Sequence, residues 1–418
     1  MLDIKFIREN PEKVKVGCKK KNAVCDVDGV LALDEKRKEA MTKIETLRSE
    51  QNKLGKADIE KAKELKNQIK ELYPAFKDID ERLNVLLLQF PNMPFDEVPV
   101  GKDESANVLL RKVGEIPQFD FEPKDHIEIG EQLDIIDVER GGKVAGSRFG
   151  YLKGPAALME FALVNFIMKR GVEAGFTPIV PPVFVKKEMM SAMGYIDTSQ
   201  DLAERYFFEK ENLFLVGTAE QSVGPMHANE VFAESDLPRR YIAFSTCFRE
   251  EAGSYGKDTK GILRVHQFDK VELFSYTTPE KSKEEHRFLI DFEEQLWRAL
   301  RIPYRVMQLS TGDMSRPSAS TVDIEAWLAG QPAEEGKGKG RYREVSSASN
   351  VTDFQARRLN IRFRNKENKM EFVHMLNATG FPIGRTIIAI LENYQQKDGS
   401  VRIPEVLQEY MPMKKIPA

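Results

Sequence analysis

Two runs of helical heptad spacing within residues 31–90 constrain the fold of this chain more than any other feature of its sequence. Every third or fourth residue from Leu33 to Leu54 falls on one stripe, and the same spacing recurs from Ala62 to Leu86. This alternation of three and four is typical of helices that pack along a narrow apolar seam. The two runs therefore predict two long helices folded back on each other as an antiparallel hairpin.

The break between the two runs contains residues that end and start helices. Gly55 is a helix stop, and Asp58 is an N-cap candidate for the second helix. Pro74 lies inside the second helix, where a proline kinks a helix or ends it. The exposed hairpin positions lean slightly basic, which permits contact with a phosphate backbone, although a spacer or a dimerisation element fits the same pattern.

A proline-rich and acidic segment, QFPNMPFDEVPVGKDESAN (89–107), follows the hairpin and marks a boundary. We expect one domain at residues 1–100 and a second at residues 101–418. The second domain has a long buried helix within residues 148–175, and short alternating strands follow it. Few helices separate these strands, which favours an antiparallel sheet in an α+β domain.

Composition narrows the class of protein. A net charge of −3 over 418 residues leaves any affinity for nucleic acid to local patches. No apolar run is long enough to cross a bilayer, and the first residues are neither a secretory signal nor an acid-poor transit peptide. Cys18, Cys25 and Cys247 form no CxxC pair and the histidines are scattered, so we expect no zinc site and a reduced, cytoplasmic protein.

The stretch CFREEAGSYGKDTKGILRVHQFDKVELF carries the first chemical signal, because charges lie where two strands flank a long loop. Strand alternation predicts that Arg264, Phe268 and Glu272 share one face of the second strand, together with a histidine and a lysine. Arg249 and Glu251 share a face of the first strand in the same way. Ion pairs on a solvated face explain this pattern, and so does a nucleotide site in which arginine binds phosphate and phenylalanine stacks on a base.

Two further stretches have polar residues that suit phosphate or a metal ion. Arg385 precedes the apolar run TIIAIL, where it either caps the segment or binds phosphate. Glu344 and Ser347 have oxygen ligands of the kind that Mg²⁺ accepts, although structural hydrogen bonding explains them as well. No GxxxxGK[ST] motif, no GxGxxG after a strand and no GxSxG motif is present, which argues against P-loop, Rossmann and α/β-hydrolase sites.

Taken in order, these segments resemble the seryl-tRNA synthetase family of class II aminoacyl-tRNA synthetases. GFTPIVPPV is similar to the first class II motif, FREEAGSYGKDTKGILRVHQFDKVE to the second and GFPIGRTIIAILENYQ to the third. TAE, TGDM, YREVSSASN and DFQARR fill the intervals, and the helical hairpin is itself a family feature. The resemblance covers the chain from residue 1 to 418, with a departure at Gln221, where the family usually has an apolar residue.

The resemblance implies an antiparallel six- to seven-stranded sheet flanked by helices, and a homodimer whose interface includes Pro182. It implies a ligase that activates L-serine with ATP and transfers the seryl group to serine tRNA, with ATP and Mg²⁺ as cofactors. The hairpin is expected to bind the long variable arm of serine tRNA. The loop from Ala252 to Gly261 is expected near the acceptor end, and selenocysteine tRNA is a further candidate partner.

The same resemblance implies a role for each residue of the ATP site. The ATP-binding set is Arg249, Glu251, Phe268, Glu344, Ser347 and Arg385. Arg249 matches the contact to the α-phosphate and Arg385 the contact to the γ-phosphate. Adenine is held by Glu251 and Phe268. Mg²⁺ is held by Glu344 and Ser347.

For serine, the implied binding set is Thr218, Glu220, Arg264, Glu272, Asn377 and Thr379. The first three of these resemble the residues that hold the amino and carboxylate groups, and the last three resemble those that read the hydroxyl. The implied catalytic residues are Arg249, Arg264 and Arg385. Catalysis by this set is positioning and electrostatic stabilisation, without a dedicated protein base.

Two other functions fit part of the pattern. A relative that activates an amino acid and charges a carrier protein would share the catalytic segments, but such relatives lack the helical hairpin. A catalytically inactive paralogue that binds RNA or acts as a scaffold would be expected to have lost ATP-binding residues, and all of them are present here. Serine-dependent exchange of pyrophosphate into ATP, followed by a tRNA-charging assay, separates the three.

Overall fold

The structure is a computed structural model, and it describes residues 1–55, 58–252, 260–333 and 338–418. These residues form two compact units, Met1–Pro94 and Phe95–Ala418. Most of the predicted loop from Ala252 to Gly261 lies outside the described residues, as do two residues between the hairpin helices. No helix among the described residues combines the length and apolar character needed to span a membrane.

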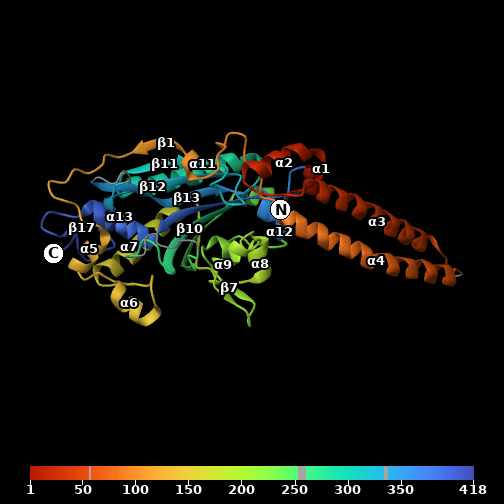
Figure 1. Cartoon of the computed structure of the whole chain (residues 1–418), viewed down its shortest axis with the longest axis horizontal. Helices are drawn as coiled ribbons and strands as arrows, with labels where there is room; N and C mark the ends of the chain where they lie inside the picture. Colours follow the sequence, from red (N-terminus) through yellow and green to blue (C-terminus); the bar gives the residue numbers. More distant parts are fainter. Residues whose placement is uncertain (56–57, 253–259, 334–337) are drawn as a thin grey trace. The chain divides into compact units, whose positions relative to one another are not determined.

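Two long helices make up most of the first unit (Figure 1). Helix α3 spans Val27–Lys53 and α4 spans Ile59–Leu88, after the shorter helices α1 (Ile4–Glu9) and α2 (Pro11–Lys20). Every described seam position is buried or half-buried, whereas the lysines between the seam positions are exposed. The antiparallel hairpin predicted from the heptad spacing is therefore confirmed.

Arg37 is the charged member of the seam, and its charge is neutralised locally. Its guanidinium lies 3.3 Å from the carboxylate of Asp34 on the same helix and 3.4 Å from that of Asp80 on α4. A polar group at one seam position specifies register at some cost in stability. The Arg37–Asp80 pair therefore fixes how the two helices align.

The connection between α3 and α4 differs from the expected one in two details. The cap of α3 is Leu54 in an extended conformation, and the carboxylate of Asp58 accepts a hydrogen bond from the Gly55 amide (3.1 Å) instead of capping α4. Pro74 does not end α4, which continues to Leu88. Pro74 is exposed, so water can satisfy the carbonyl that its missing N–H leaves free.

An eight-stranded sheet forms the centre of the second unit, in the order β1-β11-β12-β13-β16-β10-β9-β4. All neighbouring strands are antiparallel except β4 and β9, which are parallel. The α+β class is confirmed, and β1 adds one strand to the expected number. The bounds are β1 Val108–Val113, β4 Thr177–Ile179, β9 Arg239–Phe248, β10 Gln267–Thr277, β11 Tyr304–Gln308, β12 Ser320–Pro332, β13 Lys339–Asn350 and β16 His374–Pro382.

Three long helices pack against this sheet through apolar faces: α7 (Pro155–Glu173), α11 (Ser282–Ala299) and α13 (Ile383–Tyr394). Trp297 of α11 is fully buried against Phe381, and its indole N–H donates to the Ser346 hydroxyl (3.1 Å). Helix α7 is the long helix predicted within residues 148–175. These helices and the sheet share one continuous core, which holds the site strands rigidly.

Shorter elements surround this core. The helices are α5 (His126–Gln132), α6 (Val138–Ala145), α8 (Lys187–Ala192), α9 (Ser199–Ala203), α10 (Glu220–Val223) and α12 (Phe354–Leu359). The strands are β2 (Ile136–Asp137), β3 (Tyr151–Leu152), β5 (Phe184–Lys186), β6 (Phe207–Phe208), β7 (Leu213–Leu215), β8 (Val231–Ala233), β14 (Arg362–Arg364), β15 (Met370–Phe372), β17 (Val401–Arg402) and β18 (Lys415–Ile416).

The two strands that flank the long loop are shorter than predicted at their loop ends. Strand β10 begins at Gln267, so Arg264 does not share a strand face with Phe268. Strand β9 ends at Phe248, so the following arginine and glutamates lie outside the sheet. The His266 amide donates to the Arg148 carbonyl (3.1 Å), so the chain leaves the regular strand geometry here and the period of two no longer predicts its side-chain directions.

Candidate active site

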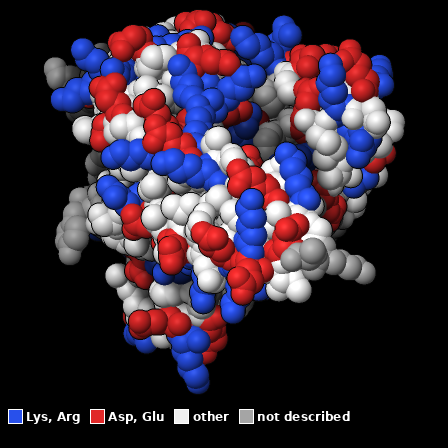
Figure 2. Space-filling view, turned by 90° about the vertical axis from the view of Figure 1, so that its right-hand side faces the viewer, with Lys and Arg blue, Asp and Glu red and all other residues white. Residues whose placement is uncertain are grey.

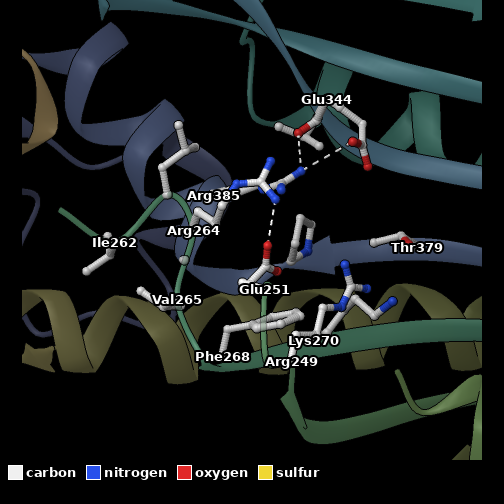
Figure 3. A pocket seen from close by; sticks show the side chains of 14 residues that line it. Arg249, Glu251, Ile262, Arg264, Val265, Phe268, Lys270, Glu344, Thr379 and Arg385 are labelled. Atoms are coloured by element: carbon white, nitrogen blue, oxygen red, sulfur yellow. Dashed lines mark hydrogen bonds and ion pairs between the residues drawn. The ribbon is translucent and has the colours of Figure 1, made fainter. Parts of the chain in front are cut away.

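One cavity collects most of the charged residues that the sequence singles out; we call it the first cavity (Figure 3). Its lining comes from the segments between β9 and β10, from β10 itself and from β13, β16 and α13. The polar and aromatic side chains that line it are Arg249, Glu251, Arg264, Phe268, Lys270, Glu344, Thr379 and Arg385.

Ion pairs hold two of its arginines in place. The Arg264 Nη1 atom donates to Glu251 Oε2 at 2.6 Å, and Figure 3 shows the two side chains pointing toward each other. Arg385 Nη1 donates to the backbone carbonyl of Glu344 at 2.8 Å and lies 3.6 Å from its carboxylate. Arg385 is in the first turn of α13, where the helix dipole also favours an anion.

Arg249 and Phe268 form an aromatic and cationic pair in the same cavity. The guanidinium carbon of Arg249 lies 5.3 Å from the centroid of the Phe268 ring. The Nε of Arg249 donates to the Gly217 carbonyl at 3.2 Å, so the side chain is anchored although its backbone lies beyond β9. The structure thus brings these two residues together through the loop and not through a shared strand face.

A second cavity adjoins the first, and Arg249, Lys270, Glu344 and Thr379 line both. Five other residues predicted for the site line only the second cavity: Thr218, Glu220, Glu272, Ser347 and Asn377. The sheet register explains part of this grouping, because Glu272 of β10 faces Thr379 of β16. Arg264 lines the first cavity and is not among the residues that line the second, so it is not grouped with Thr218 and Glu220.

Glu220 is a buried carboxylate held by two neutral donors. The Tyr195 hydroxyl donates to its Oε2 at 2.6 Å, and Gln355 Nε2 donates to its Oε1 at 3.1 Å. Burial raises the pKa of Glu220, while the two hydrogen bonds act in the opposite direction. Gln355 also donates to the Met193 carbonyl (3.1 Å), so α12 ties the carboxylate to the segment after α8.

Glu272 is the second buried carboxylate of this cavity, and it forms an ion pair with Lys270 two residues earlier on β10. Burial raises the pKa of Glu272, and the Lys270 ammonium opposes that rise. Glu220 and Glu272 are therefore stabilised in different ways, the first by neutral donors and the second by a cation.

Oxygen donors lie together on β12 and β13. The register of these strands pairs Asp323 with Ser347. Burial, and then the charge of Glu344, raise the pKa of Asp323 well above its usual range. Two carboxylates and a hydroxyl are a donor set that suits Mg²⁺ when substrate oxygens complete the coordination.

Sequence reasoning missed three residues of this site. Tyr195 and Arg205 line the second cavity, and Gln355 holds the Glu220 carboxylate. Gln355 lies in DFQARR, which resembles a family segment, so its position was recognisable although its role was not. Tyr195 and Arg205 lie in irregular segments near α9, where no periodicity indicates which side chains point inward. Only the folded chain brings them to the second cavity.

A mostly antiparallel sheet flanked by helices, with adjoining cavities lined by arginines and carboxylates, defines the catalytic core of a class II aminoacyl-tRNA synthetase. Residues 206–394 match the family described as tRNA synthetase class II core domain (G, H, P, S and T). Residues 1–94 match the seryl-tRNA synthetase N-terminal domain.

Full-length relatives then identify the family. The chain is 45% identical over 424 residues to the serine–tRNA ligase of Acidothermus cellulolyticus, covering 98% of each protein. It superposes on the crystal structure of seryl-tRNA synthetase from Pyrococcus horikoshii complexed with ATP with a TM-score of 0.89 and 40% identity, covering all of both chains. A cytoplasmic serine–tRNA ligase from Naegleria fowleri in complex with AMP gives a TM-score of 0.88 and 35% identity, covering 100% of this chain and 99% of that one.

The chain therefore belongs to the seryl-tRNA synthetase family. It is an ATP-dependent ligase that activates serine and transfers the seryl group to tRNA. The family, the fold class and the reaction predicted from the sequence are confirmed.

Proposed function

We propose that the first cavity binds ATP and that the second binds serine, so that the substrates meet where the cavities adjoin. The observation that carries this assignment is the set of side chains that line both, Arg249 among them. A serine carboxylate oxygen attacks the α-phosphorus there, pyrophosphate leaves, and seryl-adenylate forms. The Arg249 guanidinium stabilises the charge that develops on the phosphate oxygens.

Within the first cavity, Phe268 stacks on adenine and Glu251 contacts its edge. Phe268 is half-buried and lines this cavity, which supports its role as a surface on which a base stacks. Arg385 binds the γ-phosphate, supported by its place at the positive end of α13. Arg264 was expected to bind serine. Its place supports a contact with the nucleotide better, since it lines the first cavity and pairs with Glu251.

Within the second cavity, Glu220 and Thr218 bind the serine ammonium. Glu272, Asn377 and Thr379 bind the serine hydroxyl, supported by the register that sets Glu272 opposite Thr379. Alanine and glycine have no hydroxyl, so either would leave these buried polar groups unpaired. Such a site rejects analogues strongly because each unpaired buried group is costly.

Mg²⁺ is assigned to Glu344 and Ser347. Carboxylate and hydroxyl oxygens are hard ligands, and Asp323 beside Ser347 adds a further buried oxygen to the same place. A bound Mg²⁺ would supply charge neutralisation for the phosphates. Independently of the ion, Arg385 holds its position through the Glu344 carbonyl.

In the second step, the 3′-hydroxyl of the terminal adenosine of serine tRNA attacks the seryl carbonyl and AMP leaves. We assign residues 101–418 to catalysis and residues 1–100 to tRNA binding, with the hairpin on the long variable arm. Exposed lysines along α3 and α4 suit contact with backbone phosphates. On the face shown in Figure 2, basic side chains are interspersed with acidic ones, which suits recognition of shape more than strong general attraction. Selenocysteine tRNA is a second substrate to include in charging assays.

We assign the protein to the cytoplasm as a homodimer, with Pro182 at the interface. Pro182 is exposed in the single chain, as is Val180 beside it, at 79%. Helix α7 buries Met159 and Leu163 yet leaves Phe161 62% exposed. Exposed apolar side chains of this size are typical of a surface that another subunit covers.

Serine-dependent exchange of pyrophosphate into ATP tests the assignment of the two cavities. Arg249→Ala should lower the exchange rate by about 10²–10³, the usual cost of removing one electrostatic donor to a transition state. The matched control is Arg287→Ala, an exposed arginine on α11, which should exchange like the wild type. Near-normal exchange by Arg249→Ala would remove this arginine from the reaction.

A further inference from the structure

Arg205 is a second arginine of the serine cavity, and no expectation from the sequence assigns it a role. It lines the second cavity together with Arg249. Among the residues that the structure describes, its guanidinium forms no hydrogen bond and no ion pair, and its Nε is a buried nitrogen without a partner. The charges of Glu204 and Asp201 act on Arg205 in its favour, but neither forms an ion pair with it.

The other charged groups of the second cavity that bind serine are already compensated. Lys270 is paired with Glu272, and the Glu220 carboxylate accepts from Tyr195 and Gln355. Burial and the positive charge of Arg249 lower the pKa of Arg205, because both disfavour the charged guanidinium. Arg205 is half-buried, and a guanidinium without an ion-pair partner in such a place is compensated when an anion binds beside it.

Gly217 allows the two arginines to approach the same point. A Cβ at this residue would lie 3.0 Å from Arg205 Nη1 and 3.6 Å from Arg249 Cγ. The Gly217 carbonyl accepts from Arg249 Nε, and its amide donates to Gln221 Oε1 at 2.8 Å. Gln221, the departure from the usual family pattern, thus fixes the backbone between the two guanidinium groups.

The position of Arg205 relative to Glu220 indicates which anion fits. The guanidinium carbon of Arg205 lies 5.4 Å from the centroid of the Tyr195 ring, and the hydroxyl of that ring binds Glu220. The ammonium and carboxylate of an amino acid are attached to the same carbon atom. An ammonium at Glu220 therefore leaves its carboxylate within the part of the cavity that Arg205 and Arg249 line.

We propose that Arg205 binds, together with Arg249, the oxyanion at the junction of the two cavities. That oxyanion is the serine carboxylate before activation, or the α-phosphate to which it becomes joined. The proposal deepens the assignment of the second cavity to serine and rests on it. Arg205 would then act by orienting the nucleophile for in-line attack.

Two substitutions separate the charge of Arg205 from its packing. Arg205→Met keeps an unbranched side chain over Tyr195 and removes the charge, whereas Arg205→Lys restores a charge. The matched control is Lys210→Met, an exposed cation five positions further along the chain. Each variant is measured by pyrophosphate exchange for kcat, KM for serine and KM for ATP, and by inhibition with serinol, which has the ammonium and hydroxyl of serine but no carboxylate.

We expect Arg205→Met to lower kcat/KM for serine by about tenfold to a hundredfold, the range for a charge-assisted hydrogen bond. We expect Arg205→Lys to recover part of this loss and Lys210→Met to behave as the wild type. Weaker serine binding with unchanged serinol inhibition identifies the serine carboxylate as the group that Arg205 binds. A lower kcat with unchanged serine binding identifies the α-phosphate as that group. Either result supports the proposal.

Three results would overturn it: an Arg205→Met variant within twofold of the wild type, equal losses in Arg205→Met and Arg205→Lys, or weakened serinol inhibition that matches the loss for serine. Exchange by the wild type and its loss in Arg249→Ala test the cavity assignment separately. Normal Arg205 variants beside an inactive Arg249→Ala would therefore refute only the role of Arg205.

Discussion

The neighbours of the buried Glu220 side chain control both its ionisation and its orientation, and both matter for binding an ammonium group. Its carboxylate must be ionised to bind an ammonium group, yet burial favours the protonated form. Hydrogen bonds from Tyr195 and Gln355 oppose this rise in the pKa of Glu220 and so favour the charged form. The two donors therefore serve the charge state of Glu220 as well as its orientation.

This balance predicts the behaviour of Tyr195→Phe. Loss of the hydroxyl removes a hydrogen bond that lowers the pKa of Glu220, so that pKa rises. The acidic limb of the pH profile of kcat/KM for serine should then move to higher pH, with a loss of about tenfold at neutral pH. KM for ATP should change little.

The profile is measured by pyrophosphate exchange, with Tyr206→Phe as the control, since Tyr206 has no hydrogen bond to Glu220 among the described contacts. An acidic limb that stays in place in Tyr195→Phe would show that this hydroxyl does not control the ionisation of Glu220.

Individual candidate residues were assigned from the sequence where a motif carries them. The adenine and phosphate candidates lie in long ordered motifs, and the structure brings Arg249, Phe268 and Arg385 to one cavity. Tyr195 and Arg205 were not predictable, because irregular segments have no period that tells an inward side chain from an outward one. Gln355 was visible as part of DFQARR, but its bond to Glu220 spans 135 positions in the chain.

At the scale of elements, periodicity predicted the structure best where the residues that pack together recur at a regular spacing. The seam of the hairpin follows from local spacing alone, because each helix needs only the other to bury its stripe. The β10 strand was predicted too long, since its first residues bond to loops that no local pattern reveals. Hence the prediction that Arg264 shares a strand face with Phe268 was wrong, although both residues line the first cavity.

The hairpin predicts a separation of the two steps of the reaction. Replacing residues 36–85 by a short glycine-serine turn should leave serine-dependent pyrophosphate exchange within about twofold, because the first unit has its own contacts. Charging of serine tRNA should fall by tenfold or more, measured as kcat/KM for tRNA. Unchanged charging would contradict the assigned contact with the variable arm.

A full-length variant separates the contribution of the hairpin's lysine charges to tRNA binding from that of its shape. Changing Lys63 and Lys70 to glutamate leaves the seam intact, since both side chains are exposed. If these lysines contact phosphates, charging should weaken and its dependence on salt should become shallower. Pyrophosphate exchange should stay normal.

At the scale of the whole molecule, the fold class was predictable because the motifs occur in one order along the entire chain. Assembly as a homodimer stays a prediction that depends on the family resemblance, since the partner surface of a subunit has no pattern of its own in the sequence. The single chain adds a physical reason, because Phe161 on α7 and Val180 after β4 are left exposed.

If this apolar surface is the dimer interface, one charge placed on it should separate the two subunits. The wild type should sediment at twice the chain mass of 47.7 kDa, and Phe161→Asp should sediment as a single chain at micromolar concentration, because the aspartate would have to be desolvated in the interface. The control Val24→Asp changes a valine that is 97% exposed in the first unit, and it should remain dimeric. A dimeric Phe161→Asp would place the interface elsewhere.

The most direct test of the two adjoining cavities is a crystal structure with a non-hydrolysable seryl-adenylate analogue. We predict that its adenine lies on Phe268, that its seryl ammonium contacts Glu220, and that the group replacing the phosphate lies beside Arg249. An analogue bound outside these cavities, or with its adenine beside Glu220, would contradict the account.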